Sequence, residues 1–534
     1  MTKLTAILNA KIYTDWYSQP SEAILIENGL IKQTGSTQAI LSSLPSDSEK
    51  FDMQGMIIWP GLCDAHLHLE QLAKQLSAIN CEGLSKEEIL DKVHQKAHSL
   101  APGEWIIGFG FNQNDWSPPE YGNSRELDAV SPHHPVMLHA KSLHAAWVNS
   151  HVMQIAGIHA QSPDPNSGAF LRYKDGSPNG ILLEQAIECV AKHIPPISPQ
   201  QMAKDLLQTQ SYLHSLGITS VHDFDDLTMA EALLKINAEQ SLSLRVMKNM
   251  RFNNFDLLTR EDYRATLNDG EFLHAGWLKL FADGALGPQS AAMLAPYENS
   301  TNRGMLLMSV DEMAEIGIQA ARRGWSLSIH AIGDLATRSS LDAIEKIQQA
   351  TQTQNIKQQL PHRVEHIQAL DPSDLNRFHA LGVVASIQPT HACSDFLTAE
   401  RLWGARCKHA YAYKSLLESG AELFLGTDAP VELANPFHTL YAAVTRQTLQ
   451  GEPKPDGWYP AQRLSLRETL TGMTVSPARY FGTAAQTGKL TPGSNADFIV
   501  LKDDPFCLPA TEIAAIKPLM TFVAGKQVYC ASGL

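Results

Sequence analysis

The chain has 534 residues, of which 44% are hydrophobic and 18% charged, the balance of a globular protein that can bury more than one core. Its formal net charge of -14 argues against nucleic acid as a partner, because phosphate binding needs a basic face. The seven cysteines are scattered and the first ten residues are polar. No apolar run approaches the roughly 20 residues that cross a bilayer. These features predict a cytoplasmic protein without membrane contact.

Short strand-like runs dominate both ends of the chain. Near the N-terminus, with an Asn28-Gly29 turn between two of them, they cover residues 5–12, 23–27, 30–34 and 56–59. Near the C-terminus, residues 496–501 read as a strand and residues 518–530 as a hairpin. These patterns predict that residues 1–60 and 478–534 form one composite β-sandwich domain.

The stretch from residue 70 to residue 210 is far longer than an ordinary connection between a strand and a helix. It contains a polar helical segment at residues 85–100, a strand-like run at 135–139 and a helical pattern at 200–216. We interpret residues 70–210 as an insertion after the first barrel strand that covers or lines the active site.

Strand and helix patterns alternate from about residue 217 onward. Together with the buried run that ends before His66, the candidate strands lie at residues 218–224, 243–247, 277–282, 325–330, 363–366, 383–388 and 421–426. Eight strands alternating with helices predict an α/β fold with a (β/α)8 TIM barrel, built from residues 61–69 and 211–477. In such barrels the chemistry lies at the C-terminal ends of the strands.

Side chains that can bind metal follow these strands at the predicted rim. They are His66, His68, Lys279, His330, His366 and Asp428. Each residue alone is a weak signal, because a single His at a strand end is more often a satisfied polar residue, and an Asp before Ala-Pro can merely cap a turn. Imidazole and carboxylate together suit a divalent ion of the zinc type, so the joint pattern predicts a metal site.

Lys279 lies inside an apolar strand, where a buried ammonium is costly unless it is paired or modified. The sequence leaves both explanations open. An unmodified amine would need a carboxylate partner such as Asp283 or Asp428, whereas a modified amine would no longer be a buried cation.

The motifs around these residues resemble the metal-dependent amidohydrolase superfamily, in particular the YtcJ-like branch that includes N-substituted formamide deformylases. The resemblance covers nearly the whole chain and rests on residues 60–68, 279–284, 330–334, 363–366 and 426–431. It implies a binuclear centre in which His66, His68 and Asp428 hold one ion and His330 and His366 hold the other. Lys279, carboxylated on its amine, would bridge the two ions through anionic oxygens. An unmodified Lys279 would instead leave a site for one metal ion. Zinc is the default metal.

The resemblance implies a hydrolase that uses a metal-activated hydroxide to cleave an amide-type C–N bond, such as an N-formyl or N-acyl bond, in a small molecule. Asp428 would serve as both ligand and general acid and base. His144, in the insertion, would polarise the substrate carbonyl, or else be a buried structural residue beside Trp147. The exposed loops leave room for a homodimer.

Two other functions remain open at this point. The same site would also serve deamination or the cleavage of an ester or lactone. A barrel that has lost catalysis would instead act as a regulatory protein. No expected ligand is missing from the sequence, which weakens the second alternative.

Overall fold

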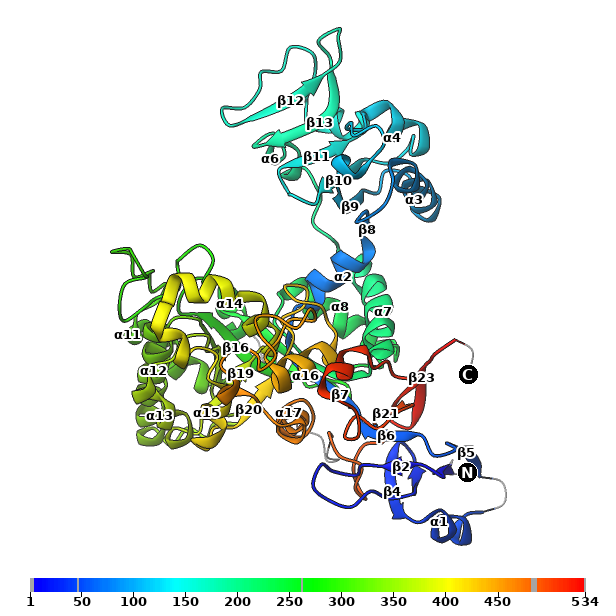
Figure 1. Ribbon diagram of the computed structural model, residues 1–534, viewed down its shortest axis with the longest axis vertical. Helices are drawn as coiled ribbons and strands as arrows, with labels where there is room; N and C mark the ends of the chain where they lie inside the picture. The colour runs from blue at the N-terminus through cyan, green and yellow to red at the C-terminus, as the bar shows by residue number, and fades with distance from the viewer. Residues whose placement is uncertain (1–3, 46–47, 261–262, 482–486, 533–534) are drawn as a thin grey trace. The chain divides into compact units, whose positions relative to one another are not determined.

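A computed structural model describes residues 4–45, 48–260, 263–481 and 487–532 (Figure 1). The protein divides into two compact units, one made of Met1–Leu72 with Met202–Leu534 and the other of Ala73–Gln201. Within the described ranges, no helix is both long and apolar enough to cross a membrane. The domain boundaries expected from the sequence stay a prediction.

Eight parallel strands form the central sheet of the larger unit, and each pairs with the next in the order in which they follow along the chain. They are β7 (Leu62–Leu67), β14 (Ile218–Asp223), β15 (Arg245–Arg251), β16 (Leu273–Phe281), β17 (Leu327–Ala331), β18 (Arg363–His366), β19 (Val384–Ile387) and β20 (Leu423–Leu425). A bridge between Leu67 and Ala429 brings the two ends of the sheet together. The sheet is therefore nearly closed into a barrel, which confirms the predicted TIM-type α/β fold.

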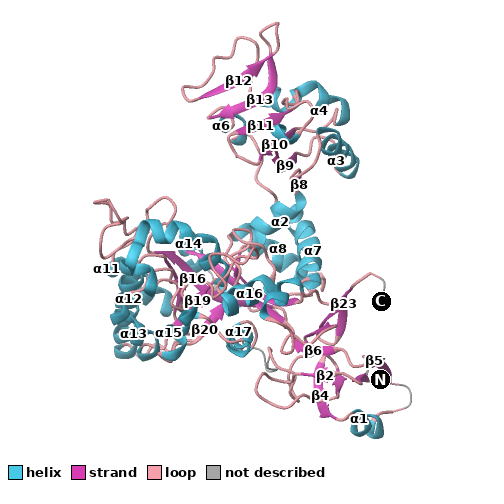
Figure 2. Ribbon diagram, in the orientation of Figure 1, coloured by secondary structure: helices cyan, strands magenta, loops and turns pink. Residues whose placement is uncertain are grey.

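Helices follow the barrel strands and lie around the sheet (Figure 2). The main ones are α8 (Leu227–Ala238), α11 (Val310–Ala321), α12 (Asp334–Thr353), α13 (Leu375–Ala380), α14 (Pro389–Trp403), α15 (Tyr413–Glu418) and α16 (Pro436–Thr445). Helix α11 begins at a capping box, in which Ser309 and Glu312 each bond the other's backbone N–H. Helix α14 begins with Pro389, whose fixed φ suits the first helical position.

Strands from both termini form two further sheets in the larger unit. One has the order β4-β3-β1-β5 and the other β2-β6-β21-β22-β23. Their strands are β1 (Leu4–Leu8), β2 (Lys11–Ile12), β3 (Ala23–Glu27), β4 (Leu30–Gly35), β5 (Glu49–Asp52), β6 (Ile57–Pro60), β21 (Phe498–Leu501), β22 (Met520–Val523) and β23 (Lys526–Cys530). Because β6 pairs with β21, the N-terminal and C-terminal segments share one sheet. Ile7, Ile24, Ile58 and Phe498 pack in the common core.

Two expectations about the N-terminal strands are wrong in detail. The run at residues 5–12 is two strands in different sheets, because Asn9 (φ 54°) turns the chain between them. The buried strand before the histidines, β6, belongs to the terminal sheet, and a separate strand, β7, enters the barrel and contains His66 itself. The chain switches sheets at Gly61, where any Cβ atom would come within 2.3 Å of Thr219 Oγ1.

The smaller unit is built on a six-stranded sheet of order β12-β13-β11-β10-β9-β8. Its strands are β8 (Ile79–Asn80), β9 (Ile106–Phe111), β10 (Val136–Ala140), β11 (Ala145–Val148), β12 (Gly168–Arg172) and β13 (Pro178–Glu184). Helices α3 (Lys86–Ser99), α4 (Ser124–Val130) and α5 (Ser150–Ile155) accompany it. Phe111, Leu138 and Trp147 are fully buried in its core, so this unit has a hydrophobic interior of its own.

Candidate metal centre

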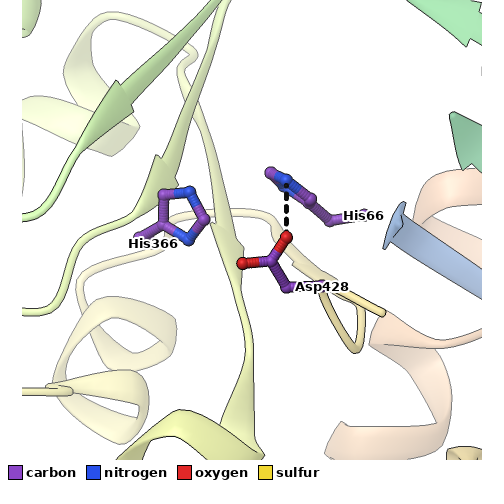
Figure 3. Close-up of side chains that lie close together, drawn as sticks. All are labelled: His66, His366 and Asp428. Carbon is purple, nitrogen blue, oxygen red and sulfur yellow. Dashed lines mark ion pairs between the residues drawn. The ribbon is translucent and has the colours of Figure 1, made fainter. Parts of the chain in front are cut away.

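Three of the predicted ligands meet at the C-terminal rim of the barrel (Figure 3). His66, His366 and Asp428 each offer one ligand atom, and these atoms lie within 4.8 Å of one another. Asp428 Oδ1 is 3.5 Å from His66 Nε2 and 3.3 Å from His68 Nε2. The ring of His330 lies beside that of His366, with 4.5 Å between centroids. The four histidines and the aspartate therefore line one space.

Barrel closure places Asp428 beside the two histidines of the first strand. The Asp428 N–H donates to the carbonyl of His66 at 2.7 Å, and the His68 N–H donates to the carbonyl of Ala429 at 2.8 Å. The chain has positive φ at Asp428 (61°), at His366 (72°) and at Ile367 (48°). Such backbone strain in residues other than glycine is uncommon and gathers at functional sites.

Each of the four histidines has one ring nitrogen held by an acceptor. On the first strand, Nδ1 of His66 lies 2.7 Å from Glu365 Oε2 and Nδ1 of His68 lies 3.0 Å from Asp225 Oδ1. Nδ1 of His366 lies 2.9 Å from Gln388 Oε1. Nε2 of His330 lies 2.9 Å from the carbonyl oxygen of Gly284. In a neutral ring, an acceptor at one nitrogen fixes the tautomer and leaves the lone pair on the other nitrogen, as metal-binding histidines require.

The pKa values of three of these rings favour the neutral form that binds metal. Burial, with the charge of Lys279, lowers the pKa of His66 to about 4 and that of His330 to about 3. Burial also holds the pKa of His366 well below its usual range. His68 differs: burial would lower its pKa, but hydrogen bonds to Asp225 and Asp428 raise it to about 9. Metal binding at His68 must therefore release a proton near neutral pH.

Lys279 points into the same region from β16 and is almost wholly buried. Its Nζ lies 4.7 Å from the centre of the Phe224 ring. No hydrogen bond or ion pair joins it to any residue that the structure describes, so the pairing with Asp283 or Asp428 that the sequence left open is not seen. Burial lowers the pKa of the amine to about 8.

Two aspartates in the ligand-bearing motifs accept hydrogen bonds from backbone N–H groups. Asp283 accepts hydrogen bonds from the N–H groups of Ala292, Ile332 and Gly333. Asp64 accepts from the N–H and the hydroxyl of Thr427. Asp283 therefore fixes the backbone that follows His330, and Asp64 fixes the residue before Asp428.

Several residues around the centre received no role from the sequence. Asp225, Glu365 and Gln388 are the side-chain acceptors of the histidines, and His391 Nε2 lies 3.2 Å from Asp428 Oδ2. Glu365 and Gln388 lie next to motif residues or strand ends, so the sequence predicts that they are near the site. It does not predict which histidine each one contacts, because a contact between strands depends on register and rotamer.

His144 lies in the smaller unit, just before β11. Its side chain is 71% exposed, which excludes the buried structural residue that the sequence left open. Its Nδ1 lies 2.9 Å from Glu184 Oε2, which orients the ring. The suggested contact of His144 with a substrate carbonyl stays a prediction.

The donor set fits a divalent ion of the zinc type. It combines imidazole nitrogens with a carboxylate, and Asp428 is ionised at neutral pH because the nearby histidines keep its pKa well below the usual range despite burial. The ring centre of His366 lies 4.9 Å from that of His66 and 4.5 Å from that of His330, so His366 is close to both groups of ligands. The predicted division of ligands between two ions stays a prediction.

A match to the amidohydrolase family model extends over residues 49–529. The chain belongs to the amidohydrolase family. One relative is the amidohydrolase YtcJ of Bacillus subtilis. It is 30% identical over 95% of this chain and 96% of its own length. The N-substituted formamide deformylase of Arthrobacter pascens is 26% identical over 99% of this chain and 98% of its own.

A solved structure of an uncharacterized metal-dependent hydrolase from Pyrococcus furiosus is also similar to this amidohydrolase. It has a TM-score of 0.75 and 28% identity, with 94% of this chain and 99% of the other chain covered. The family and this structure together support a hydrolase that uses a divalent metal. They confirm the resemblance that the motifs indicated.

Proposed function

We propose that this amidohydrolase cleaves an amide-type C–N bond, such as an N-formyl or N-acyl bond, in a small molecule. The observation that carries the proposal is the set of four histidines at the strand ends, each with one nitrogen held by an acceptor, around an ionised Asp428. The relationship to an N-substituted formamide deformylase supports this choice of bond.

We propose that the centre takes two divalent ions, with zinc as the expected metal, and that Lys279 is carboxylated and serves as their shared ligand. The lowered pKa of Lys279 supports this modification, because only the neutral amine attacks carbon dioxide. The new N–C bond forms as the amine loses a proton, and the product is an anionic carbamate. A buried cation that has no hydrogen bond or ion pair among the described residues is thereby converted into an oxygen ligand.

Divalent ions bound at such a site lower the pKa of water and polarise a carbonyl group. Asp428 would act as the general base, a role that the closeness of its Oδ1 to Nε2 of both His66 and His68 supports. It would accept the proton of the attacking water and then donate that proton to the leaving amine. His66, His68, His330 and His366 would hold the metal, and their acceptors would keep the rings from turning.

The test is a hydrolysis screen of the zinc-loaded protein on N-formyl, N-acyl and cyclic amide substrates. We expect release of free amine from at least one of these classes, and loss of that activity after chelation. Hits confined to esters or phosphotriesters would overturn the choice of bond. Ammonia released from a ring amine would instead favour deamination.

The state of Lys279 is tested independently of substrate. We expect a carbamate signal in the carbon-13 spectrum of protein that was loaded with zinc in labelled bicarbonate. A Lys279→Met variant is the control and should show no such signal. One ion per chain and no carbamate would contradict the bridged pair.

A further inference from the structure

The two carboxylate oxygens of Asp428 face different partners. Oδ1 lies 3.5 Å from His66 Nε2 and 3.3 Å from His68 Nε2. Oδ2 lies 3.2 Å from Nε2 of His391, which is buried. Because a carboxylate only accepts, the imidazole must donate its Nε2–H across this contact. One oxygen is thus held by a protein donor, and the other faces the metal-binding histidines.

The ring of His391 is itself fixed from its other side. Its Nδ1 lies 3.6 Å from Glu432 Oε1, an ion-pair distance. The same Glu432 oxygen accepts the hydroxyl hydrogen of Ser394 at 2.6 Å. Ser394 is one turn after His391 on α14, and Glu432 is four residues after Asp428 on the loop that follows β20. The chain Asp428–His391–Glu432–Ser394 therefore connects that loop to the helix twice.

Residues at the start of α14 contact two of the proposed metal ligands. Gln388, the residue before the helix, accepts from Nδ1 of His366, and His391 holds Asp428. The carbonyl of Gln388 accepts the hydroxyl hydrogen of Tyr413 at 3.1 Å. The first turn of α14 is thus anchored by its own contacts, so it can orient the residues that it touches.

We propose that His391 is a positioning residue for the hydrolytic reaction, holding Oδ2 of Asp428 so that Oδ1 stays turned toward His66 and His68, with Glu432 holding the His391 ring. This inference rests on the proposed function of the centre. A carboxylate turns freely about its Cβ–Cγ bond unless one oxygen is anchored. Loss of the anchor therefore misplaces the base and ligand without removing it.

The test uses the full-length, metal-loaded protein with paired substitutions. His391→Leu keeps much of the volume and removes the donor, whereas His391→Gln returns an N–H donor at a similar distance from the backbone. Glu432→Gln weakens the hold on the ring from a partly exposed position and provides a variant with little risk to folding. His214→Gln is the matched control, since His214 is a buried histidine bonded to Ile218 and Ser243, away from the centre.

Two readouts are needed, kcat and KM on a substrate from the hydrolysis screen and the visible spectrum of the cobalt-substituted protein. We expect His391→Leu to lower kcat by about 10- to 100-fold with little change in KM, and to alter the cobalt spectrum. His391→Gln should recover most of kcat and a spectrum close to that of the wild type. Glu432→Gln should show a smaller loss, and His214→Gln an unchanged cobalt spectrum.

Equal losses of kcat in His391→Leu and His391→Gln would overturn the proposal, because a donor would then make no difference. An unchanged cobalt spectrum in His391→Leu would overturn it as well. Failure of the proposed function is distinguishable, since a wild-type protein without hydrolase activity would still show whether the spectrum depends on the His391 donor.

Discussion

At the scale of single residues, the metal centre depends on what holds each side chain as much as on the side chains themselves. Four histidines have an acceptor at one ring nitrogen, and Asp428 has a donor at one oxygen. Each contact removes a rotation that the free side chain would have. Single substitutions at this level should therefore separate chemistry from folding.

Asp428→Asn is the most direct of these substitutions. It keeps the size of the side chain and one oxygen but removes the negative charge that a ligand and base need. We expect turnover to fall by at least about 100-fold, with far-ultraviolet circular dichroism unchanged, because Asp428 holds few backbone groups. Near-normal turnover in this variant would contradict the role of Asp428.

His362, which is not one of the proposed metal ligands, should make the stability of the fold depend on pH. Its Nδ1 accepts the Leu327 N–H at 2.9 Å, and burial lowers its pKa from 6.5 to about 4. The unfolded chain therefore binds more protons than the folded chain between these values, so stability present above pH 6.5 is lost as the pH falls toward 4. From pH 7 to pH 5 the loss from this group is about 2 kcal/mol.

Chemical denaturation at the two pH values measures this effect. A His362→Gln variant lacks the titrating ring, so its stability should fall less between pH 7 and pH 5 than that of the wild type. The same fall in both proteins would show that other groups cause the acid sensitivity.

At the scale of elements, Gly426 decides whether β20 can close against β7. A Cβ atom at this position would lie 2.4 Å from the backbone nitrogen of His66 and 2.8 Å from its Cβ. We expect Gly426→Ala to displace His66, to lower stability by about 1–3 kcal/mol and to reduce the metal content measured by mass spectrometry.

Gly35→Ala is the matched control for this substitution. Gly35 ends β4, has no neighbouring atom within 4 Å of an added Cβ and needs no positive φ. It should keep both its metal content and its stability. Full metal occupancy in Gly426→Ala would show that the strands can separate without moving His66.

The alternation of strands and helices was readable because barrel strands are apolar runs of ordinary length between amphipathic helices. Residues 363–366 were predicted with the bounds of β18. The first strand was misplaced because β6 and β7 are both buried and only Gly61 separates them. Hydrophobicity cannot show that the chain changes sheets there, since only the close approach of Thr219 makes the glycine necessary.

The candidate ligands were predictable because they occur where strands end, and barrel strands end at one rim. The residues that orient them were not. His391 stands in the first turn of a helix, where a polar side chain is unremarkable in sequence, and only the fold brings it to Asp428. Periodicity predicts the face on which a side chain lies but not its partner across space.

At the scale of the whole molecule, the barrel and the terminal sheets belong to one unit. Arg245, fully buried on β15, donates from Nε to Asp497 Oδ2 at 2.6 Å and from Nη2 to Oδ1 at 3.0 Å. Asp497 precedes β21 and also accepts the Ala524 N–H. This two-pronged pair ties the barrel to the terminal sheet, while the unit of residues 73–201 has a separate core.

This division into two units predicts which part of the chain metal binding will stabilise. All six proposed ligands lie in the larger unit. Ligand binding stabilises the state that binds it, by about 2.7 kcal/mol when the free metal is 100 times its dissociation constant. We therefore expect zinc to slow hydrogen exchange by up to about 100-fold in peptides that contain His66 or Asp428 and to leave residues 73–201 nearly unchanged.

Hydrogen exchange followed by mass spectrometry measures both regions in one sample of metal-stripped and zinc-loaded protein. The Asp428→Asn variant is the control, because loss of a ligand should reduce the protection at the barrel rim while the smaller unit exchanges as before. Equal protection in both units would contradict the prediction, since the smaller unit supplies none of the proposed ligands. Protection confined to the rim would place the metal where the strand ends meet.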